Sequence, residues 1–172
     1  MPNSERDGRP ILLMLRMRPP WVFVDEIRRF VEGFCACASP GRNREAQVAL
    51  AVHELMQNAI PQAGGAEVDL SLQVDLQAGR IEISVSNPCT EEAYLELLLR
   101  LEQINAEPDA LRGYLKAMQE TPSAHRGGLG LARVRFEAQL ELSVAREGQR
   151  VTILAHGPLD APQLPVPGGR HA

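Results

Sequence analysis

The chain has 172 residues, of which 44% are hydrophobic and 23% charged, and its formal net charge is -4 at pH 7. This length suits one domain with a substantial core and is short for two domains. The acidic balance, the lack of a basic cluster and an aromatic content of only 4% argue against nucleic acid or a membrane surface as a partner.

No stretch of the sequence reaches the roughly 18 apolar residues of a membrane span. The first ten residues, MPNSERDGRP, are too polar for a secretory signal peptide, so we expect a cytoplasmic protein. Cys35, Cys37 and Cys89 provide neither a disulfide framework nor the spacing of a metal site. We expect all three to be reduced, with Cys35 or Cys37 packing in the core.

The N-terminal part of the chain predicts one strand and one helix. Residues 1–9 are expected to be disordered, and the apolar run 11–17 reads as a strand at the edge or the centre of a sheet. Two prolines then open a helix from about Val22 to Ala38. Trp21, just before this helix, is expected to be a packing anchor. The residues expected on the buried side of the helix are Val24, Ile27, Phe30, Val31 and Phe34.

The segment from Asn43 to Pro61 predicts an amphipathic helix, with Asn43 as its N-cap and Pro61 as its stop. Glu54 and Asn58 are four residues apart and therefore neighbours on the flank of its apolar stripe. A carboxylate beside a carboxamide at that place can hold a metal ion and orient a nucleophile. The alternative is an ordinary solvated helix flank.

Two β-hairpins follow from alternating apolar residues. The first joins 68–76 to 81–85 through the loop 77–79, and the second joins 140–144 to 151–153 around Gly148. One antiparallel sheet with a single apolar face needs a cover of helices. The sequence therefore predicts an α+β protein, a two-layer α/β sandwich with the helices on one face of the sheet.

Between the hairpins lie a helical insert and a glycine-rich turn. The insert predicts one helix over Glu92 to Asn105 and a second, short helix after Pro108. The glycine-rich segment Arg126-Gly127-Gly128-Leu129-Gly130-Leu131 opens a further helix. A helix N-terminus favours phosphate, and glycines let backbone amides approach it closely. A plain turn before a helix is the alternative.

Taken in order, HELMQNA, a hairpin and GGLGL resemble the Bergerat ATP-binding fold. This is the histidine-kinase-like ATPase (GHKL) fold of gyrase, sensor histidine kinases, anti-sigma-factor kinases and one class of heat-shock chaperone. The resemblance implies such a domain over residues 10–157, with an ATP lid at about 90–126. Residues 1–9 and 158–172 would be a disordered N-terminus and a flexible tail.

The resemblance also implies the roles of individual residues, with ATP and Mg²⁺ as cofactors. Asn58 matches the asparagine that ligates the Mg²⁺ bridging the phosphates, and Glu54 matches the carboxylate that positions or deprotonates the attacking hydroxyl. The residues that match the phosphate-binding box are Arg126, Gly127, Gly128, Leu129 and Gly130.

The first glycine box of that family departs from the pattern. The family places Asp-x-Gly-x-Gly after the second hairpin strand, with the aspartate reading the adenine amino group. Here the strand ends Ser-Val-Ser-Asn87-Pro88-Cys89. Asn87 offers an amide oxygen to adenine, whereas Pro88 forbids a flexible glycine turn. Adenine recognition, and with it turnover, is therefore in question.

The Asn-Pro ending, the helical insert and the GLGL box look most like a bacterial branch of SiaB-type kinases, which resemble anti-sigma-factor serine/threonine kinases. Two functions are then open. The chain is an ATP-dependent kinase of a small regulatory, anti-anti-sigma-like partner protein, or it is a non-catalytic relative that binds such a partner. The sequence leaves a homodimer open and names neither the partner nor its phosphorylated residue.

Overall fold

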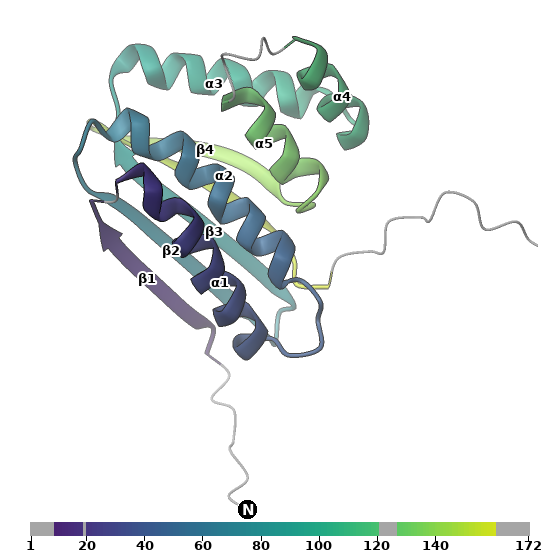
Figure 1. Cartoon of the computed structure of the whole chain (residues 1–172). Coiled ribbons are helices and arrows are strands. Elements are labelled where there is room, and N and C mark those ends of the chain that lie inside the picture. Colours follow the sequence, from purple (N-terminus) through teal and green to yellow (C-terminus); the bar gives the residue numbers. More distant parts are fainter. Residues whose placement is uncertain (1–8, 19, 121–126, 161–172) are drawn as a thin grey trace, which may run out of the picture.

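The computed structural model describes residues 9–18, 20–120 and 127–160 (Figure 1). In chain order, the described elements are β1 Ile11–Met17, a short 3₁₀ turn Trp21–Phe23, α1 Val24–Ala38, α2 Glu45–Ala63, β2 Val68–Asp75, β3 Arg80–Pro88, α3 Glu91–Ala106, α4 Ala110–Glu120, α5 Gly127–Phe136, β4 Glu141–Glu147 and β5 Arg150–Pro158.

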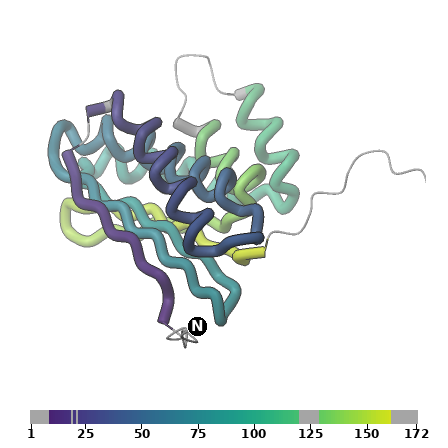
Figure 2. Tube along the Cα trace, turned by 60° about the horizontal axis from the view of Figure 1, so that its bottom comes forward, coloured from purple at the N-terminus to yellow at the C-terminus, as the bar shows by residue number. Residues whose placement is uncertain are grey.

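The strands form one five-stranded sheet in the order β1-β2-β3-β5-β4, and every neighbouring pair is antiparallel. The helices gather on one side of this sheet, with α1 and α2 lying along it (Figures 1 and 2). The predicted α+β sandwich with helices on one face is therefore confirmed. β1 is an edge strand, which decides between the two places that the sequence left open for it.

The alternation of buried and more exposed residues along the strands explains why the hairpins form. Every second residue of β2 is buried, and the same holds for β3. In the first hairpin the Asp75 carboxylate accepts hydrogen bonds from the backbone amides of Gln77 and Ala78, at 3.0 and 2.8 Å. Gly79 then takes a left-handed φ of 62°, which costs glycine little. This turn chemistry fixes the register of the strands.

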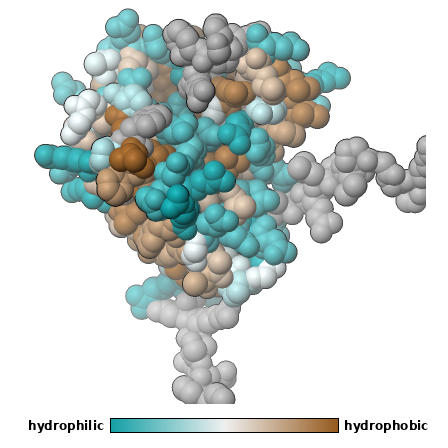
Figure 3. Space-filling view, in the orientation of Figure 1, coloured by the Kyte–Doolittle hydropathy of each residue, from teal (hydrophilic) through white to brown (hydrophobic). Residues whose placement is uncertain are grey.

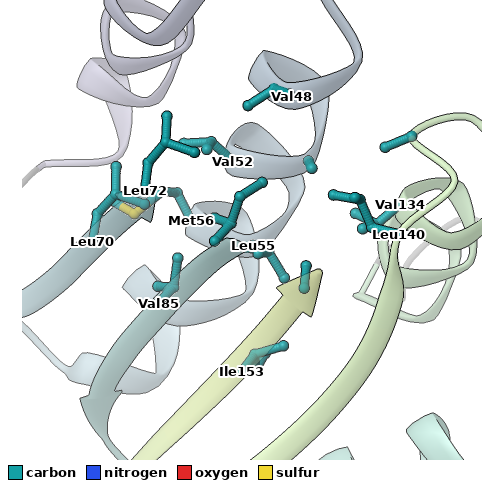
Figure 4. Close-up of a cluster of buried hydrophobic side chains, with 14 of the residues drawn as sticks. Val48, Val52, Leu55, Met56, Leu70, Leu72, Val85, Val134, Leu140 and Ile153 are labelled. Atoms are coloured by element: carbon teal, nitrogen blue, oxygen red, sulfur yellow. The ribbon is translucent and has the colours of Figure 1, made fainter. Parts of the chain in front are cut away.

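The core lies between α2 and the sheet (Figure 4). Leu55 and Met56 of α2 are completely buried because they lie where the helix crosses the central strands. The labelled side chains around them are Val48, Val52, Leu70, Leu72, Val85, Val134, Leu140 and Ile153. This packing holds α2 in place, and α2 carries Glu54 and Asn58.

Both predicted ends of α2 are wrong. Asn43 has a φ of 52° and is not the N-cap, because the helix starts at Glu45. Arg44 occupies the cap position and donates to the carbonyls of Ala138 and Pro158, at 2.7 and 3.1 Å. Pro61 lies inside the helix, which ends only where Gly64 takes a left-handed φ of 58°.

The prediction for α1 is partly wrong. Val24, Ile27 and Val31 are buried, but Phe30 is 52% exposed. It lies on the flank of the helix, beside the buried stripe and not within it. Cys35 is the buried member of the cysteine pair and Cys37 is exposed. The packing expected of the Trp21 side chain lies outside what the structure describes. Among the described residues no helix is both long and apolar enough to cross a bilayer.

Candidate functional site

Glu54 lies in the middle of α2 and faces α5. Its side chain is only 7% exposed, and its Oε1 lies 2.6 Å from Nη1 of Arg133. Its other oxygen, Oε2, faces Gly130, where an added Cβ would lie only 2.4 Å from it. The absence of a side chain at Gly130 therefore lets α5 approach the buried carboxylate. The structure brings together two residues that the sequence places 76 positions apart.

Arg133 is the residue that sequence reasoning missed. Its guanidinium is shared between two carboxylates, because Nε also donates to Oε1 of Glu137 at 2.9 Å. The hydrogen bond to Glu137 and the charges of both carboxylates raise the pKa of Arg133, against the opposing effect of burial. The Arg133–Glu137 spacing of four residues is a visible ion-pair signal. Nothing in the sequence links it to Glu54.

Asn58 lies one helical turn after Glu54 and is half-buried. Its Nδ2 donates to the backbone carbonyl of Glu54 at 2.7 Å, which fixes the orientation of the amide. No described residue donates a hydrogen bond to its Oδ1. The side chain thus offers an oxygen of the kind that Mg²⁺ prefers.

Asn87 lies near the end of β3 and is 2% exposed. Its Nδ2 donates to the carbonyl of Pro88 at 2.8 Å. β3 stays paired with β5 through Pro88, which lies opposite Arg150. The segment that the sequence analysis compares with a first glycine box is therefore a paired strand and not an open loop.

A small cavity lies between Asn58 and Asn87, with β5 and α3 among its walls. The side chains that α3 contributes are Ala93, Glu96, Leu97 and Arg100. The cavity has a volume of about 60 Å³, room for a few water molecules. Ligand pockets measure about 300–1,000 Å³. The cavity is therefore too small for a nucleotide in the conformation that the structure describes.

A wider hollow of about 420 Å³ lies beside this cavity and shares Gln62 and Cys89 with it. It runs along the first residues of α3 toward the β4–β5 hairpin, where Arg146 forms an ion pair with Glu91 and lies 5.1 Å from the centre of the Tyr94 ring. Burial raises the pKa of the Cys89 thiol, so this cysteine is a poor nucleophile.

The other predicted residues belong to the start of α5. Gly127, Gly128 and Leu129 form its first turn, so the glycine-rich segment opens a helix as predicted. Arg126 lies outside the described residues. In the described ranges no group of three or more His, Cys, Asp or Glu side chains could hold a metal ion. Mg²⁺ does not need such a group when phosphates supply most of its ligands.

His53, which precedes Glu54, faces away from this site. Its Nε2 lies 2.7 Å from Nε2 of Gln57, and its Nδ1 lies 3.5 Å from the Asp25 carboxylate on α1. These contacts place the imidazole on the α1 side of α2, whereas Glu54 faces α5. The histidine therefore takes no part in the candidate site.

Comparison with known proteins identifies the fold but no family. No family model matches the chain, and no curated protein matches its sequence. A chain in the crystal structure of the SiaB–SiaC complex from Pseudomonas aeruginosa is similar in structure, with a TM-score of 0.65 and 16% sequence identity. The match covers 87% of this chain and 90% of that chain. At this identity the likeness shows a shared fold.

Proposed function

We propose that this chain is a regulatory protein that binds a small partner protein and transfers phosphate from ATP to a serine or threonine of that partner. The observation that carries the proposal is the contact between the Glu54 carboxylate and Gly130. It joins the candidate base to the helix whose N-terminus suits phosphate. The structural likeness to a chain of the SiaB–SiaC complex supports a protein partner.

The described residues fit ATP and Mg²⁺ in chemical kind. Asn58 has a free amide oxygen for the ion, Asn87 carries an amide oxygen for the adenine amino group, and the first turn of α5 is rich in glycine. When bound, Mg²⁺ would withdraw negative charge from the phosphates and ease their transfer. The cavity of about 60 Å³ implies that α3 opens before the nucleotide enters.

The task of Glu54 is to take the proton of the attacking hydroxyl. Its Oε1 is held by Arg133 at 2.6 Å, which fixes the direction of the carboxylate. Its Oε2 has no hydrogen-bond donor among the described residues and faces Gly130. We assign Oε2 as the proton acceptor. The same ion pair and the close approach of Gly130 shield the carboxylate, so the hydroxyl reaches it only if α5 shifts.

A second candidate function is a non-catalytic regulator that binds its partner without turnover. Three observations favour it. Glu54 is buried against a permanent cation, the strand stays paired through Pro88 where the family has a glycine loop, and the cavity measures only about 60 Å³. A buried Glu54–Arg133 pair is then a structural tie between α2 and α5.

Incubation with labelled ATP, Mg²⁺ and the small partner purified from the native host separates the two functions. The kinase proposal predicts labelling of the partner, a loss of about 10²–10⁴-fold in Glu54→Gln, and unchanged partner binding in that variant. Glu67→Gln is the matched control, since Glu67 is in an exposed ion pair with Arg18. A wild-type protein that binds its partner under saturating ATP and Mg²⁺ yet labels nothing would overturn the kinase proposal and favour the regulator.

A further inference from the structure

The polar side chains around the small cavity do not satisfy one another. The residues with polar side chains that line it are Asn58, Gln62, Asn87, Glu96 and Arg100. Their only hydrogen bonds with described residues run from the amide nitrogens of the two asparagines to backbone carbonyls. Polar groups inside a protein are usually paired, and exceptions call for an explanation. The cavity therefore leaves donors and acceptors for a ligand.

Arg100 of α3 is the cation of this set. It is half-buried, yet it forms no ion pair with a described residue. Glu96, one helical turn earlier, has the spacing of an ion pair, but it is exposed and forms none with a described residue either. By contrast, Arg133 and Arg146 each hold a carboxylate. A half-buried guanidinium gives up part of its hydration, and here no described carboxylate replaces it.

Arg100 lies at the point where α3 becomes anchored to the rest of the protein. None of residues 91–100 is buried, whereas Leu101 and Ile104 are. The backbone carbonyl of Ile104 also accepts a hydrogen bond from Arg135 of α5. A movement of the first turns of α3 therefore leaves Arg100 in the wall of the cavity.

A phosphate group with an attached Mg²⁺ fits the chemistry of the walls. Asn58 offers its Oδ1 to the ion. Asn87, which is 2% exposed, offers a second amide oxygen, because its nitrogen is held by the carbonyl of Pro88. Arg100 offers a planar set of N–H donors that matches the oxygens of a phosphate. The volume of about 60 Å³ suits one such group, which takes the space of a few waters.

We propose that Arg100 binds a phosphate group of the nucleotide and so makes α3 part of the nucleotide site. The inference rests on the proposed binding of ATP and Mg²⁺. It adds an arginine of the helical insert to a site otherwise built from α2, β3 and α5. Glu96, which lines the same cavity, repels the phosphates, so the two charges of α3 change the affinity in opposite directions.

The second helix of the insert, α4, differs from α3. In Figure 3 brown atoms gather at the upper right, where Figure 1 places α4, whereas hydrophilic atoms cover much of the centre, where it places α2. The exposed apolar residues of α4 are Leu111, Leu115 and Met118. α4 contributes no residue to the cavity. Its Arg112, with a side chain that is 78% exposed, is therefore a matched control for Arg100.

Calorimetric titration of the purified full chain with ATP and Mg²⁺ tests the proposal. Arg100→Met keeps an unbranched side chain but removes the charge and the donors. It should weaken ATP binding by about 10–100-fold, as expected for a lost hydrogen bond between charged groups. Arg100→Lys, which keeps the charge without the planar fork, should lose less. Arg112→Met should bind ATP as the wild type does.

Competition experiments separate a contact with phosphate from a structural role of Arg100. Inorganic tripolyphosphate should displace ATP from the wild type, and its affinity for Arg100→Met should be lower by about 10-fold or more. Adenosine, which has no phosphate, should bind both proteins equally. If Arg100 only maintained the shape of the cavity, both competitors would weaken together, and this result would overturn the proposal.

Glu96→Gln gives a test in the opposite direction. It removes a negative charge from the cavity wall and should tighten ATP binding by about 2–5-fold, the effect of one exposed charge. If Glu96→Gln instead weakens ATP binding more than Arg100→Met does, α3 holds the metal ion and not the phosphate. The role of Arg100 would then be refuted.

The result for Arg100 can be told apart from the result for the kinase proposal. A wild type that binds ATP but labels no partner, with weaker binding in Arg100→Met, would refute the kinase and support the role of Arg100. A wild type that labels its partner, with ATP and tripolyphosphate binding unchanged in Arg100→Met, would overturn the role of Arg100 alone. A wild type that binds neither ATP nor tripolyphosphate would overturn both.

Discussion

Gly130→Ala and Gly33→Ala form a matched pair that should change stability in opposite directions. Both glycines lie inside α-helices, where alanine is favoured over glycine by about 1 kcal/mol. Around Gly33 no atom lies within 4 Å of the place a Cβ would take, so the substitution in α1 should stabilise the protein by about 0.5–1 kcal/mol. At Gly130 that place lies 2.4 Å from Oε2 of Glu54.

The size of the effect at Gly130 follows from what holds Glu54. To reach an ordinary contact the carboxylate must move by about 1 Å, and this strains the 2.6 Å contact of Oε1 with Arg133. A hydrogen bond between charged groups contributes about 1.5–3 kcal/mol. Against a gain of about 1 kcal/mol in helix propensity, Gly130→Ala should destabilise the protein by about 0.5–2 kcal/mol.

Urea unfolding of both variants measures this difference through the midpoint at an unchanged m value. A third protein, Gly130→Ala combined with Glu54→Ala, supplies the control, because the added methyl group then no longer meets a carboxylate. The alanine at position 130 should cost less in that background than in the wild type. If Gly130→Ala stabilises the protein as much as Gly33→Ala does, the close contact between Glu54 and α5 is refuted.

Three further predictions concern the core and the charges around it. Arg133→Met leaves the Glu54 carboxylate buried and unpaired and should lower the unfolding free energy, measured in urea, by about 2–3 kcal/mol. Arg29→Met removes an exposed ion pair and should lower it by less than about 0.5 kcal/mol. Equal losses in the two variants would argue against the buried pair. Burial raises the pKa of Cys35 to about 12 from 9.0, so the folded state keeps a proton that the unfolded chain loses. The resulting stability is present below pH 9 and is lost as the pH rises from 9 toward 12. The wild type should therefore lose more unfolding free energy over that interval than Cys35→Ala. Parallel curves of unfolding free energy against pH for the two proteins would contradict this. Leu55→Ala, at a fully buried position, should lower the unfolding free energy by about 3 kcal/mol, and a loss below 1 kcal/mol would show that α2 does not pack there.

The strands and the sandwich could be predicted because their signals are local. Period-two alternation in residues 68–76 and 81–85 is visible without knowledge of any distant partner. The ends of α2 could not be predicted in the same way. Arg44 takes the capping position because its guanidinium reaches the carbonyls of Ala138 and Pro158, which lie more than 90 residues away and leave no mark near Asn43.

The candidate site, too, was predictable only where its signals are local in the sequence. The spacing of Glu54 and Asn58 placed them on one flank of a helix, as the structure has them. Arg133 was missed because its ion pair with Glu54 spans 79 residues. Phe30 was expected in the core because an exposed aromatic residue and a buried one have the same periodicity within a helix.

The measurement that tests the nucleotide site most directly is a calorimetric titration of the purified protein with ATP, with and without Mg²⁺. The wild-type protein should bind ATP in a Mg²⁺-dependent manner. Asn58→Ala should abolish this binding without moving the thermal midpoint, because a half-buried flank residue contributes little to packing. Gln57→Ala is the matched control, since Gln57 faces His53, and it should bind ATP as the wild type does. Equal binding by Asn58→Ala and the wild type, or no binding by the wild type at millimolar ATP, would contradict the proposed nucleotide site.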